Sequence, residues 1–276
     1  MPGLASASWR AIGGGFGTSS LPNLRDAGGH PTRQGGRVRS GILYRSGAPS
    51  RLQPVAIAAL AELGIRQAID LRSPAERAVA PVSLPQGVVP MPIDVLADAS
   101  GLTPTLLERL LADPAMVGAA LAGRTGAEVS ERRFRDFVAL ESACRGYGNV
   151  MMSLAGEVGR PALIHCSTGK DRTGWAVAIL LTLLDVPRQH VMADFLLSAE
   201  LLEPVLEPAR RAFVARGGDS ETFDSLSGVR PQNLDAAFDE ALCEYGSIDG
   251  YIERGLGIGV ATRGALREAF VEDPVG

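Results

Sequence analysis

The strongest constraint on the fold lies in residues 160–184, where two apolar segments flank a short polar loop. The first segment, RPALIHC (160–166), has the length and apolar content of a buried strand. The second, from Thr173 to Leu184, is a longer apolar run that predicts a buried helix. Where strands and helices alternate along a chain in this way, the pattern predicts an α/β fold with a mostly parallel sheet flanked by helices.

The chain before this segment alternates in the same way, and glycine, proline and polar capping residues mark the ends of its elements. The first elements expected are two short strands around Gly35–Gly36 within 32–46, a helix from Pro54 that ends before Gly64, and strands within 65–73 and 87–94. Four helices are expected next. Two short ones begin at Thr103–Pro104 and at Asp113–Pro114, a longer one runs from Ser130 to about Arg145, and the fourth spans 147–158.

The pattern changes in the last third of the chain. Residues 188–273 show no convincing strand and are interrupted by Pro204, Pro208 and Pro231. Proline breaks helices, and short helical pieces can move relative to one another. The sequence therefore predicts a helical C-terminal part over 188–276, packed on the sheet and forming lid elements.

Length and composition suit one large globular domain. The chain has 276 residues, of which 46% are hydrophobic, enough to bury a full core. Residues 1–20 are glycine-rich and aperiodic, so we expect a flexible N-terminal arm followed by a single domain over 21–276. The net charge of −4 does not favour nucleic-acid binding, and no pattern specifies an oligomeric state.

Several features bear on the compartment. The longest apolar run, 175–184, is too short to cross a bilayer, so stable membrane insertion is not expected. The N-terminus lacks the continuous apolar stretch of a signal peptide. The three cysteines are far apart and predict neither a disulfide framework nor paired metal ligands. We expect a cytoplasmic protein, with export by a route that needs no signal peptide as the alternative.

The loop HCSTGKDRTG does not fit a nucleotide-binding loop but does fit a nucleophilic cysteine. A Walker A loop needs Ser or Thr after its lysine, and Asp171 stands there instead. Cys166 ends the predicted strand, and Thr173 begins the predicted helix. The backbone N–H groups of such a loop and the helix N-terminus attract an anion, and the same field favours the thiolate form of the cysteine.

The residues that follow the cysteine predict a phosphate-binding cup. Gly169 allows a positive φ, Arg172 can bind two oxygens of an anion, and Thr173 can donate its hydroxyl to the sulfur. A thiolate that faces a bound phosphate predicts phosphoryl transfer to Cys166 and then hydrolysis by water. This chemistry needs no metal or other cofactor. The expected phosphate-binding residues are Ser167, Thr168, Gly169, Lys170, Asp171 and Arg172.

Four further polar residues are interpreted from the sequence. His165 is interpreted as orienting the loop through side-chain hydrogen bonds, with direct proton transfer as the alternative. Lys170 is the only lysine in the chain, and we expect it at the rim of the cup as a mobile charge for a second phosphate or an inositol ring. Asp70 and Arg72 are interpreted as a structural turn pair.

The leaving oxygen needs a proton, so a carboxylic acid is expected opposite the loop. Asp94 follows the strand predicted within 87–94, and ligand crevices lie beyond the carboxyl ends of such strands. Asp171, inside the loop, is the second candidate, and Asp98 is the third. The sequence leaves the choice among these three open.

The loop resembles the signature of the cysteine-based protein tyrosine phosphatase superfamily, in which His-Cys is followed by five residues and then by Arg-Ser/Thr. His165, Cys166, Arg172 and Thr173 match it. The version HCxxGKDRTG is similar to that of the bacterial tyrosine and lipid phosphatases related to mycobacterial PtpB. Further similar segments are NLRDAGG (23–29), GILYRS (41–46), IDLRS (69–73), MADFLLS (192–198) and YGSIDGYI (245–252).

The resemblance implies an α/β phosphatase fold with helical lid elements. It also implies activity on phosphotyrosine and often on phosphoinositides, so the expected partners are phosphorylated proteins or phosphoinositide lipids. Two other functions stay open. One is a rhodanese-like sulfurtransferase, although such loops have four residues between the cysteine and the arginine. The other is a module that binds a phosphorylated ligand without turnover, which would need no nucleophile.

Overall fold

The computed structural model describes residues 21–101 and 103–272. At its centre is a five-stranded sheet that contains, in spatial order, β1 (Arg25–Asp26), β3 (Leu43–Ser46), β6 (Ala162–His165), β4 (Gln67–Asp70) and β5 (Val89–Pro92). β3, β6, β4 and β5 run parallel, and β1 pairs antiparallel with β3 at one edge. The expected α/β fold with a mostly parallel sheet is therefore confirmed.

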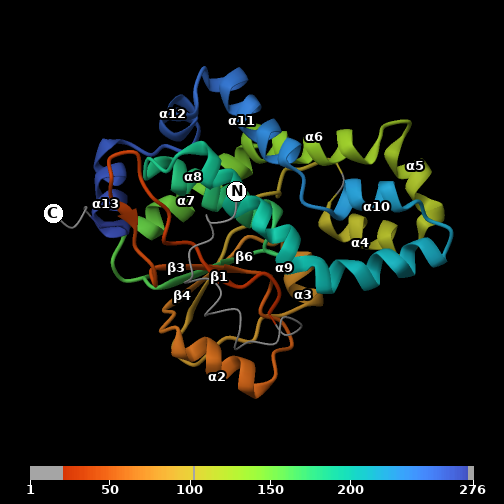
Figure 1. The fold of residues 1–276 in the computed structure, drawn as a ribbon, viewed down its shortest axis with the longest axis horizontal. Coiled ribbons are helices and arrows are strands. Elements are labelled where there is room, and N and C mark those ends of the chain that lie inside the picture. The colour runs from red at the N-terminus through yellow and green to blue at the C-terminus, as the bar shows by residue number, and fades with distance from the viewer. Residues whose placement is uncertain (1–20, 102, 273–276) are drawn as a thin grey trace.

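Different helices cover the two faces of the sheet (Figure 1). One face is covered by α2 (Pro54–Glu62), and the other by α7 (Glu141–Ala155) and α8 (Asp171–Leu183). Successive side chains of a strand point to opposite faces. In β6, Leu163 accordingly packs with the α2 side, and Ile164 packs with the α7 and α8 side. The central strand is thus buried on both faces, as its continuous apolar sequence predicts.

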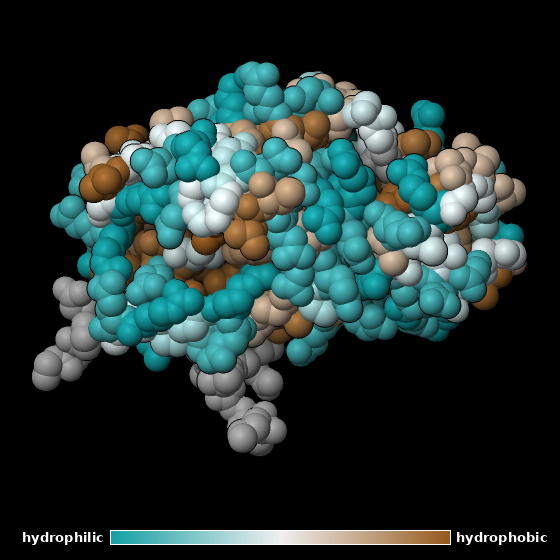
Figure 2. All heavy atoms as spheres, turned by 90° about the horizontal axis from the view of Figure 1, so that it is seen from above, coloured by the Kyte–Doolittle hydropathy of each residue, from teal (hydrophilic) through white to brown (hydrophobic). Residues whose placement is uncertain are grey.

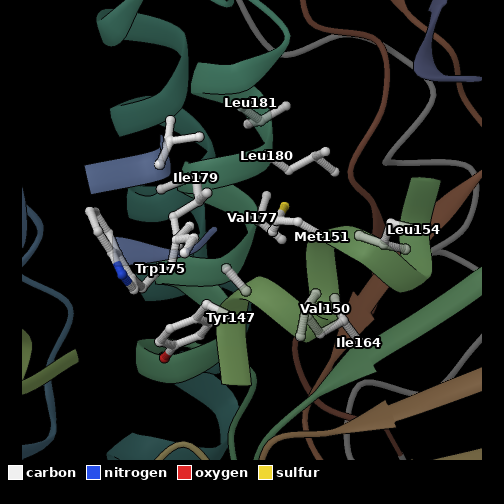
Figure 3. Packing of buried hydrophobic residues seen from close by; sticks show 14 of the residues in the cluster. Tyr147, Val150, Met151, Leu154, Ile164, Trp175, Val177, Ile179, Leu180 and Leu181 are labelled. Carbon is white, nitrogen blue, oxygen red and sulfur yellow. The ribbon is translucent and has the colours of Figure 1, made fainter. Parts of the chain in front are cut away.

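The main core lies between the sheet and the pair α7 and α8. Figure 3 shows its side chains approaching one another from both helices and from β6. Trp175 is completely buried and lies with its ring centroid 5.9 Å from that of Tyr251. This packing fixes the first turns of α8, where the polar loop ends. The side chains labelled in the figure are Tyr147, Val150, Met151, Leu154, Ile164, Trp175, Val177, Ile179, Leu180 and Leu181.

A group of helices extends beyond one end of the sheet (Figure 1), and we call it the helical lobe. It consists of α4 (Pro104–Ala112), η1 (Pro114–Met116), α5 (Val117–Leu121), α6 (Gly126–Ala139), α9 (Arg188–Ala215) and α10 (Ser220–Ser227). The lobe has its own apolar cluster, to which Leu110, Val129, Phe213 and Phe223 contribute. The predicted starts of α4 and of the η1–α5 segment, at Thr103 and Asp113, are confirmed as side-chain caps.

The long helix α9 corrects one prediction. Pro204 and Pro208 were expected to break this segment into pieces, yet both lie inside one continuous helix of 28 residues. The two prolines are exposed and four residues apart, on one side of the helix. Backbone carbonyls that lose their N–H partner there can be hydrated by solvent, so the helix continues past both positions.

The rest of the C-terminal part is helical with one exception. It contains α11 (Pro231–Tyr245), α12 (Ile248–Gly250), η2 (Tyr251–Gly255), α13 (Val260–Phe270) and β7 (Val271–Glu272). The two-residue strand β7 pairs antiparallel with β2 (Arg37–Val38), so the expectation of no strand in this region was wrong. β7 was not evident from the sequence because so short a strand carries no periodicity.

Two other boundaries differ from the sequence prediction. Ser130 does not cap a helix that runs to Arg145, because α6 begins after Thr125, whose side chain caps it, and ends at Ala139. Within 32–46, two short strands were expected around Gly35–Gly36, but β2 and β3 both follow these glycines; β2 pairs with β7, and β3 with β1 and β6. Across the glycines themselves, an isolated antiparallel bridge joins Pro31 and Arg37. The start of α6 is fixed by a capping residue that precedes Ser130, and the pairing of β2 and β3 is fixed by strands distant in the sequence.

The surface carries no continuous apolar face in the view of Figure 2, where hydrophilic residues cover most of the molecule. In the ranges 21–101 and 103–272, no helix is long and apolar enough to span a bilayer. The predicted N-terminal arm, residues 1–20, lies outside the described residues.

Two helical glycines provide a matched test of packing. A Cβ on Gly148 in α7 would lie 2.4 Å from the carbonyl oxygen of Leu256, whereas a Cβ on Gly264 in α13 would meet nothing within 4 Å. We expect Gly148→Ala to lower the free energy of unfolding by about 1–3 kcal/mol through overpacking. Gly264→Ala should raise it by about 0.5–1 kcal/mol through helix propensity. Urea unfolding measures both, and equal effects of the two substitutions would contradict the packing seen here.

Candidate active site

The polar loop lies at the carboxyl end of β6, in the middle of the sheet, and leads directly into α8. Cys166 follows the strand and is buried. Gly169 has a φ of 69°, and a Cβ there would lie 2.2 Å from the carbonyl oxygen of Ser46 at the end of β3. Only glycine fits this position without displacing the neighbouring strand, so the expectation of a positive φ at Gly169 is met.

The loop presents unpaired backbone donors. In the described part of the chain, no backbone carbonyl accepts a hydrogen bond from the amides of Ser167, Thr168, Gly169 or Lys170. These N–H groups lie beside Cys166 and just before the N-terminus of α8. Free N–H groups together with a helix N-terminus form a site that favours an anion.

Arg172 is held by Glu76, a residue that the sequence analysis missed. Its Nη1 and Nη2 donate to the two carboxylate oxygens of Glu76 at 2.9 and 2.7 Å, and Ser167 Oγ donates to the same carboxylate at 2.5 Å. Glu76 belongs to α3 (Pro74–Val79), where it completes a capping box with Ser73. The sequence SPAE signals that capping box, but its partner Arg172 is 96 residues away.

The pairing shifts both pKa values. Burial alone would raise the pKa of Glu76, but the hydrogen bonds and charge of Arg172 lower it to about 2. Burial would lower the pKa of Arg172, but the nearby Cys166 and Glu76 raise it. The guanidinium is therefore charged and fixed in orientation at neutral pH. Nη1 also donates to the carbonyl oxygen of Leu71 and Nη2 to Ser167 Oγ, so both nitrogens are engaged within the protein and the expected binding of two anion oxygens by Arg172 is not seen in this structure.

His165 lies in β6 and is completely buried. In the described chain neither ring nitrogen has a hydrogen-bond partner, so the expected orientation of the loop through His165 side-chain hydrogen bonds is not seen. Its Nδ1 lies 3.8 Å from Asp70 Oδ1. Burial lowers the pKa of His165 to about 4, so the ring is neutral at pH 7. Asp70 is occupied by Arg72, which donates to both carboxylate oxygens, as a turn pair would.

Lys170 does not lie at the rim as a mobile charge. Its side chain is buried, and Nζ donates to Asp171 Oδ1 at 3.2 Å and to the carbonyl oxygen of Gly228 at 3.3 Å. Gly228 follows α10, so the ammonium connects the loop to the helical lobe. Thr173 is buried, and in the described chain its hydroxyl has no hydrogen-bond partner.

A cavity of about 130 Å³ lies over the loop. Its floor includes Cys166 and Arg172, and its walls include Arg133 from α6. Leu107 from α4 and Leu206 from α9 also line it, so the helical lobe covers the loop. Within the described ranges, no group of three or more His, Cys, Asp or Glu side chains is arranged to hold a metal ion.

The three acid candidates occupy different places. Asp94 accepts a hydrogen bond from the amide of Leu96 and is not a lining residue of the cavity. Asp98 accepts from the amide and hydroxyl of Ser142 at the start of α7, also away from the cavity. Only Asp171 lines it.

Asp171 is ion-paired within the cavity wall. Its Oδ2 lies 3.3 Å from Arg133 Nη2 and 3.2 Å from Lys170 Nζ. Burial would raise the pKa of Asp171, but the charges of Lys170 and Arg133 lower it. The carboxylate form is therefore favoured.

Glu108 on α4 is a second carboxyl group of the cavity, and the sequence analysis did not single it out. Burial and the charge of Glu76 raise its pKa. No local signal distinguishes Glu108, because it stands in an amphipathic helix, TLLERLL, whose polar side is expected to carry charges.

Comparison with known proteins identifies the class. The family described as "Tyrosine phosphatase family" matches residues 17–272, so the chain belongs to the tyrosine phosphatase family. It is 33% identical over 271 residues to "Triple specificity protein phosphatase PtpB" of Mycobacterium tuberculosis, covering 89% of this chain and 95% of that protein.

Two more relatives are phosphatases by name. A tyrosine-protein phosphatase of Cupriavidus necator is 31% identical over 244 residues, covering 88% of this chain and 84% of that one. A tyrosine-protein phosphatase of Nostoc commune is 29% identical over 112 residues, covering 39% and 38%. The resemblance inferred from the loop is thus confirmed over most of the chain.

The pair of Glu76 and Arg172 predicts a pH-dependent stability. Glu76 has a pKa of about 2 in the fold against an ordinary value of 4.5. Its ionised form therefore stabilises the fold above about pH 4.5, and this contribution is lost as the pH falls towards 2. We expect Glu76→Gln to cost about 3 kcal/mol of unfolding free energy at pH 7, with the difference from wild type shrinking as the pH falls.

Urea unfolding at several pH values measures that difference. The control is Glu128→Gln, because Glu128 completes a capping box in α6 without a bidentate arginine partner. A cost for Glu76→Gln that stays constant down to pH 2.5 would show that the ion pair is not its source.

Proposed function

We propose that the chain hydrolyses phosphate monoesters through a covalent phosphocysteine at Cys166, acting on phosphotyrosine in proteins and on phosphoinositides. The observation that carries this proposal is the buried Cys166 beside free loop amides and a charged, fixed Arg172. Such an arrangement holds a phosphate by fixed donors and faces it with a nucleophile. The family match favours this reading over a sulfurtransferase or a binding module without turnover.

In the first step, the Cys166 thiolate attacks the phosphorus, the S–P bond forms, and the bond from phosphorus to the leaving oxygen breaks. The leaving oxygen takes a proton from Glu108, whose raised pKa suits an acid. In the second step, water attacks the phosphorus, the S–P bond breaks, and the proton of the water passes to Asp171. The lowered pKa of Asp171 keeps its carboxylate ionised, which is the form that can accept a proton. Asp171 then releases this proton to solvent, and Glu108 takes one up from solvent before the next cycle. Both carboxyl groups line the cavity above Cys166.

The walls of the cavity support the phosphoinositide part of the proposal. Arg133 and Lys170 line it beside Arg172, which gives three cations in one cavity. An ammonium has three N–H donors, and Lys170 uses two of them, on Asp171 and Gly228. One donor remains for a phosphate on a neighbouring ring position. The name of the mycobacterial relative, a triple specificity phosphatase, agrees with a site that accepts more than one class of substrate.

The covalent step is tested with Cys166→Ser. We expect kcat for p-nitrophenyl phosphate to fall at least about 10³-fold, because a serine hydroxyl is a far weaker nucleophile at neutral pH. The variant should still bind vanadate, since the loop amides and Arg172 remain. Cys243→Ser, at an exposed cysteine, is the control and should keep wild-type activity. Substantial turnover by Cys166→Ser, or thiosulfate turnover by the wild type, would overturn the mechanism.

The substrate proposal is tested with Lys170→Met, which removes the charge and keeps much of the length. We expect kcat/KM to fall about tenfold more for polyphosphorylated inositides than for phosphotyrosine peptides, because only the inositides carry a second phosphate. Steady-state kinetics on both substrates, with Lys170→Ala beside it, measures this ratio. Equal losses on all substrates would assign Lys170 to loop structure and remove the support for inositides.

A further inference from the structure

Three segments that resemble the family, NLRDAGG, GILYRS and MADFLLS, meet behind the polar loop, on the side away from the cavity. They come from the residues around β1, from β3 and from α9, and no role in the chemistry above accounts for them. Their polar side chains are buried and bonded to one another. We call these side chains the back network, which consists of Asn23, Arg25, Arg45, Asp194 and Ser198.

The back network binds two carbonyl groups of the loop. Asn23 Nδ2 donates to the carbonyl oxygens of Thr168 at 3.2 Å and Gly169 at 2.8 Å. Arg45 Nη2 donates to the same Gly169 oxygen at 2.8 Å. The Gly169 carbonyl is therefore held by two donors, one from Asn23 just before β1 and one from Arg45 in β3.

Holding these carbonyls also directs the neighbouring N–H groups. A trans peptide is planar, and its N–H points opposite to its C=O. With the carbonyls of Thr168 and Gly169 turned to the back, the N–H groups of Gly169 and Lys170 point to the opposite side of the loop. These are two of the amides that have no backbone acceptor in the described chain.

Asp194 on α9 holds the two arginines in place. Its carboxylate accepts from Arg25 Nε at 3.1 Å and from Arg45 Nη1, and its backbone carbonyl accepts from Arg25 Nη2 at 2.8 Å. Ser198, one helical turn further along α9, accepts from Arg25 and from Asn23. Because α9 also carries Leu206 into the cavity wall, the network fixes the loop and its cover relative to each other.

We propose that Arg45 and Asn23, held by Asp194, are positioning residues that aim the loop amides at the phosphate and so contribute to transition-state binding without touching the substrate. The proposal rests on the phosphocysteine mechanism above. A purely structural role would lower thermal stability alone. A positioning role also lowers kcat and weakens vanadate binding, since vanadate resembles the five-coordinate phosphorus of the transition state.

The first test is Arg45→Lys. It keeps the positive charge but loses the planar fork that spans Asp194 and the Gly169 carbonyl. We expect kcat for p-nitrophenyl phosphate to fall at least about tenfold and the inhibition constant of vanadate to rise by a similar factor. This is the size of effect expected when one charge-assisted hydrogen bond is lost. KM and the inhibition constant of inorganic phosphate should change less, because phosphate resembles the ground state.

The second test is Asn23→Gly. Asn23 has a φ of 63°, which glycine adopts without strain, so the substitution leaves the backbone path. It removes the bonds donated to Thr168, Gly169 and Ser198 and the bond accepted from Arg25. It should reproduce the kinetic pattern of Arg45→Lys, and it keeps the proposal testable if Arg45→Lys does not fold. The control is Asp235→Asn, which breaks the exposed ion pair between Asp235 on α11 and Arg188 at the start of α9; neither residue lines the cavity, so kcat should stay unchanged.

The outcomes separate this proposal from the mechanism. Both variants with wild-type kcat and vanadate binding, but a lower melting temperature, would overturn the positioning role and leave the mechanism standing. Activity in Cys166→Ser would overturn the mechanism whatever the two variants do. A parallel loss of kcat and vanadate affinity in both, with Cys166→Ser inactive, supports the proposal.

Discussion

The structure around the loop depends on burying more positive than negative charge. Six cationic side chains lie buried beneath and beside it: Arg25, Arg45, Arg72, Arg133, Lys170 and Arg172. The acids paired with them number four: Asp70, Glu76, Asp171 and Asp194. Buried charge without a partner is strongly destabilising. A bound phosphate monoester carries a charge of about −1.5 to −2 and matches this excess of two positive charges, so such an anion completes the electrostatic balance of this part of the fold.

The sheet explains how these charges come together. β3, β6 and β4 are parallel neighbours, so their carboxyl ends bring Arg45, Cys166 and Arg72 to one edge, although they are far apart in the chain. The core between the sheet and α8 holds that helix in position. The helical lobe packs around its own cluster and reaches the loop through α4 and α9. Helices α6 and α9 contribute to both clusters, through Phe137 and Phe195 to the main core and through Val129 and Phe213 to the cluster of the lobe, so they connect the cavity floor to its cover.

The sequence predicts the local parts of this arrangement well. Strand β6, the positive φ of Gly169 and helix α8 follow from a contiguous pattern of apolar residues, glycine and polar turn residues. The contacts of Glu76 and Lys170 could not be predicted, because Arg172 and Gly228 are 96 and 58 residues away from them. The continuity of α9 was also missed, because a proline penalty applies to an isolated helix, whereas packing of Phe195, Leu202 and Phe213 decides the outcome here.

The position of Lys170 has a practical consequence for chemical labelling. It carries the only side-chain amine in the 276-residue sequence, and that amine is 5% exposed, inside the cavity wall. Acylating reagents therefore have one target besides the terminal amino group. Attachment through lysine to a resin, a dye or a crosslinker reaches this protein only through the cavity over the loop, and the extent of acylation becomes a direct gauge of how often that cavity opens.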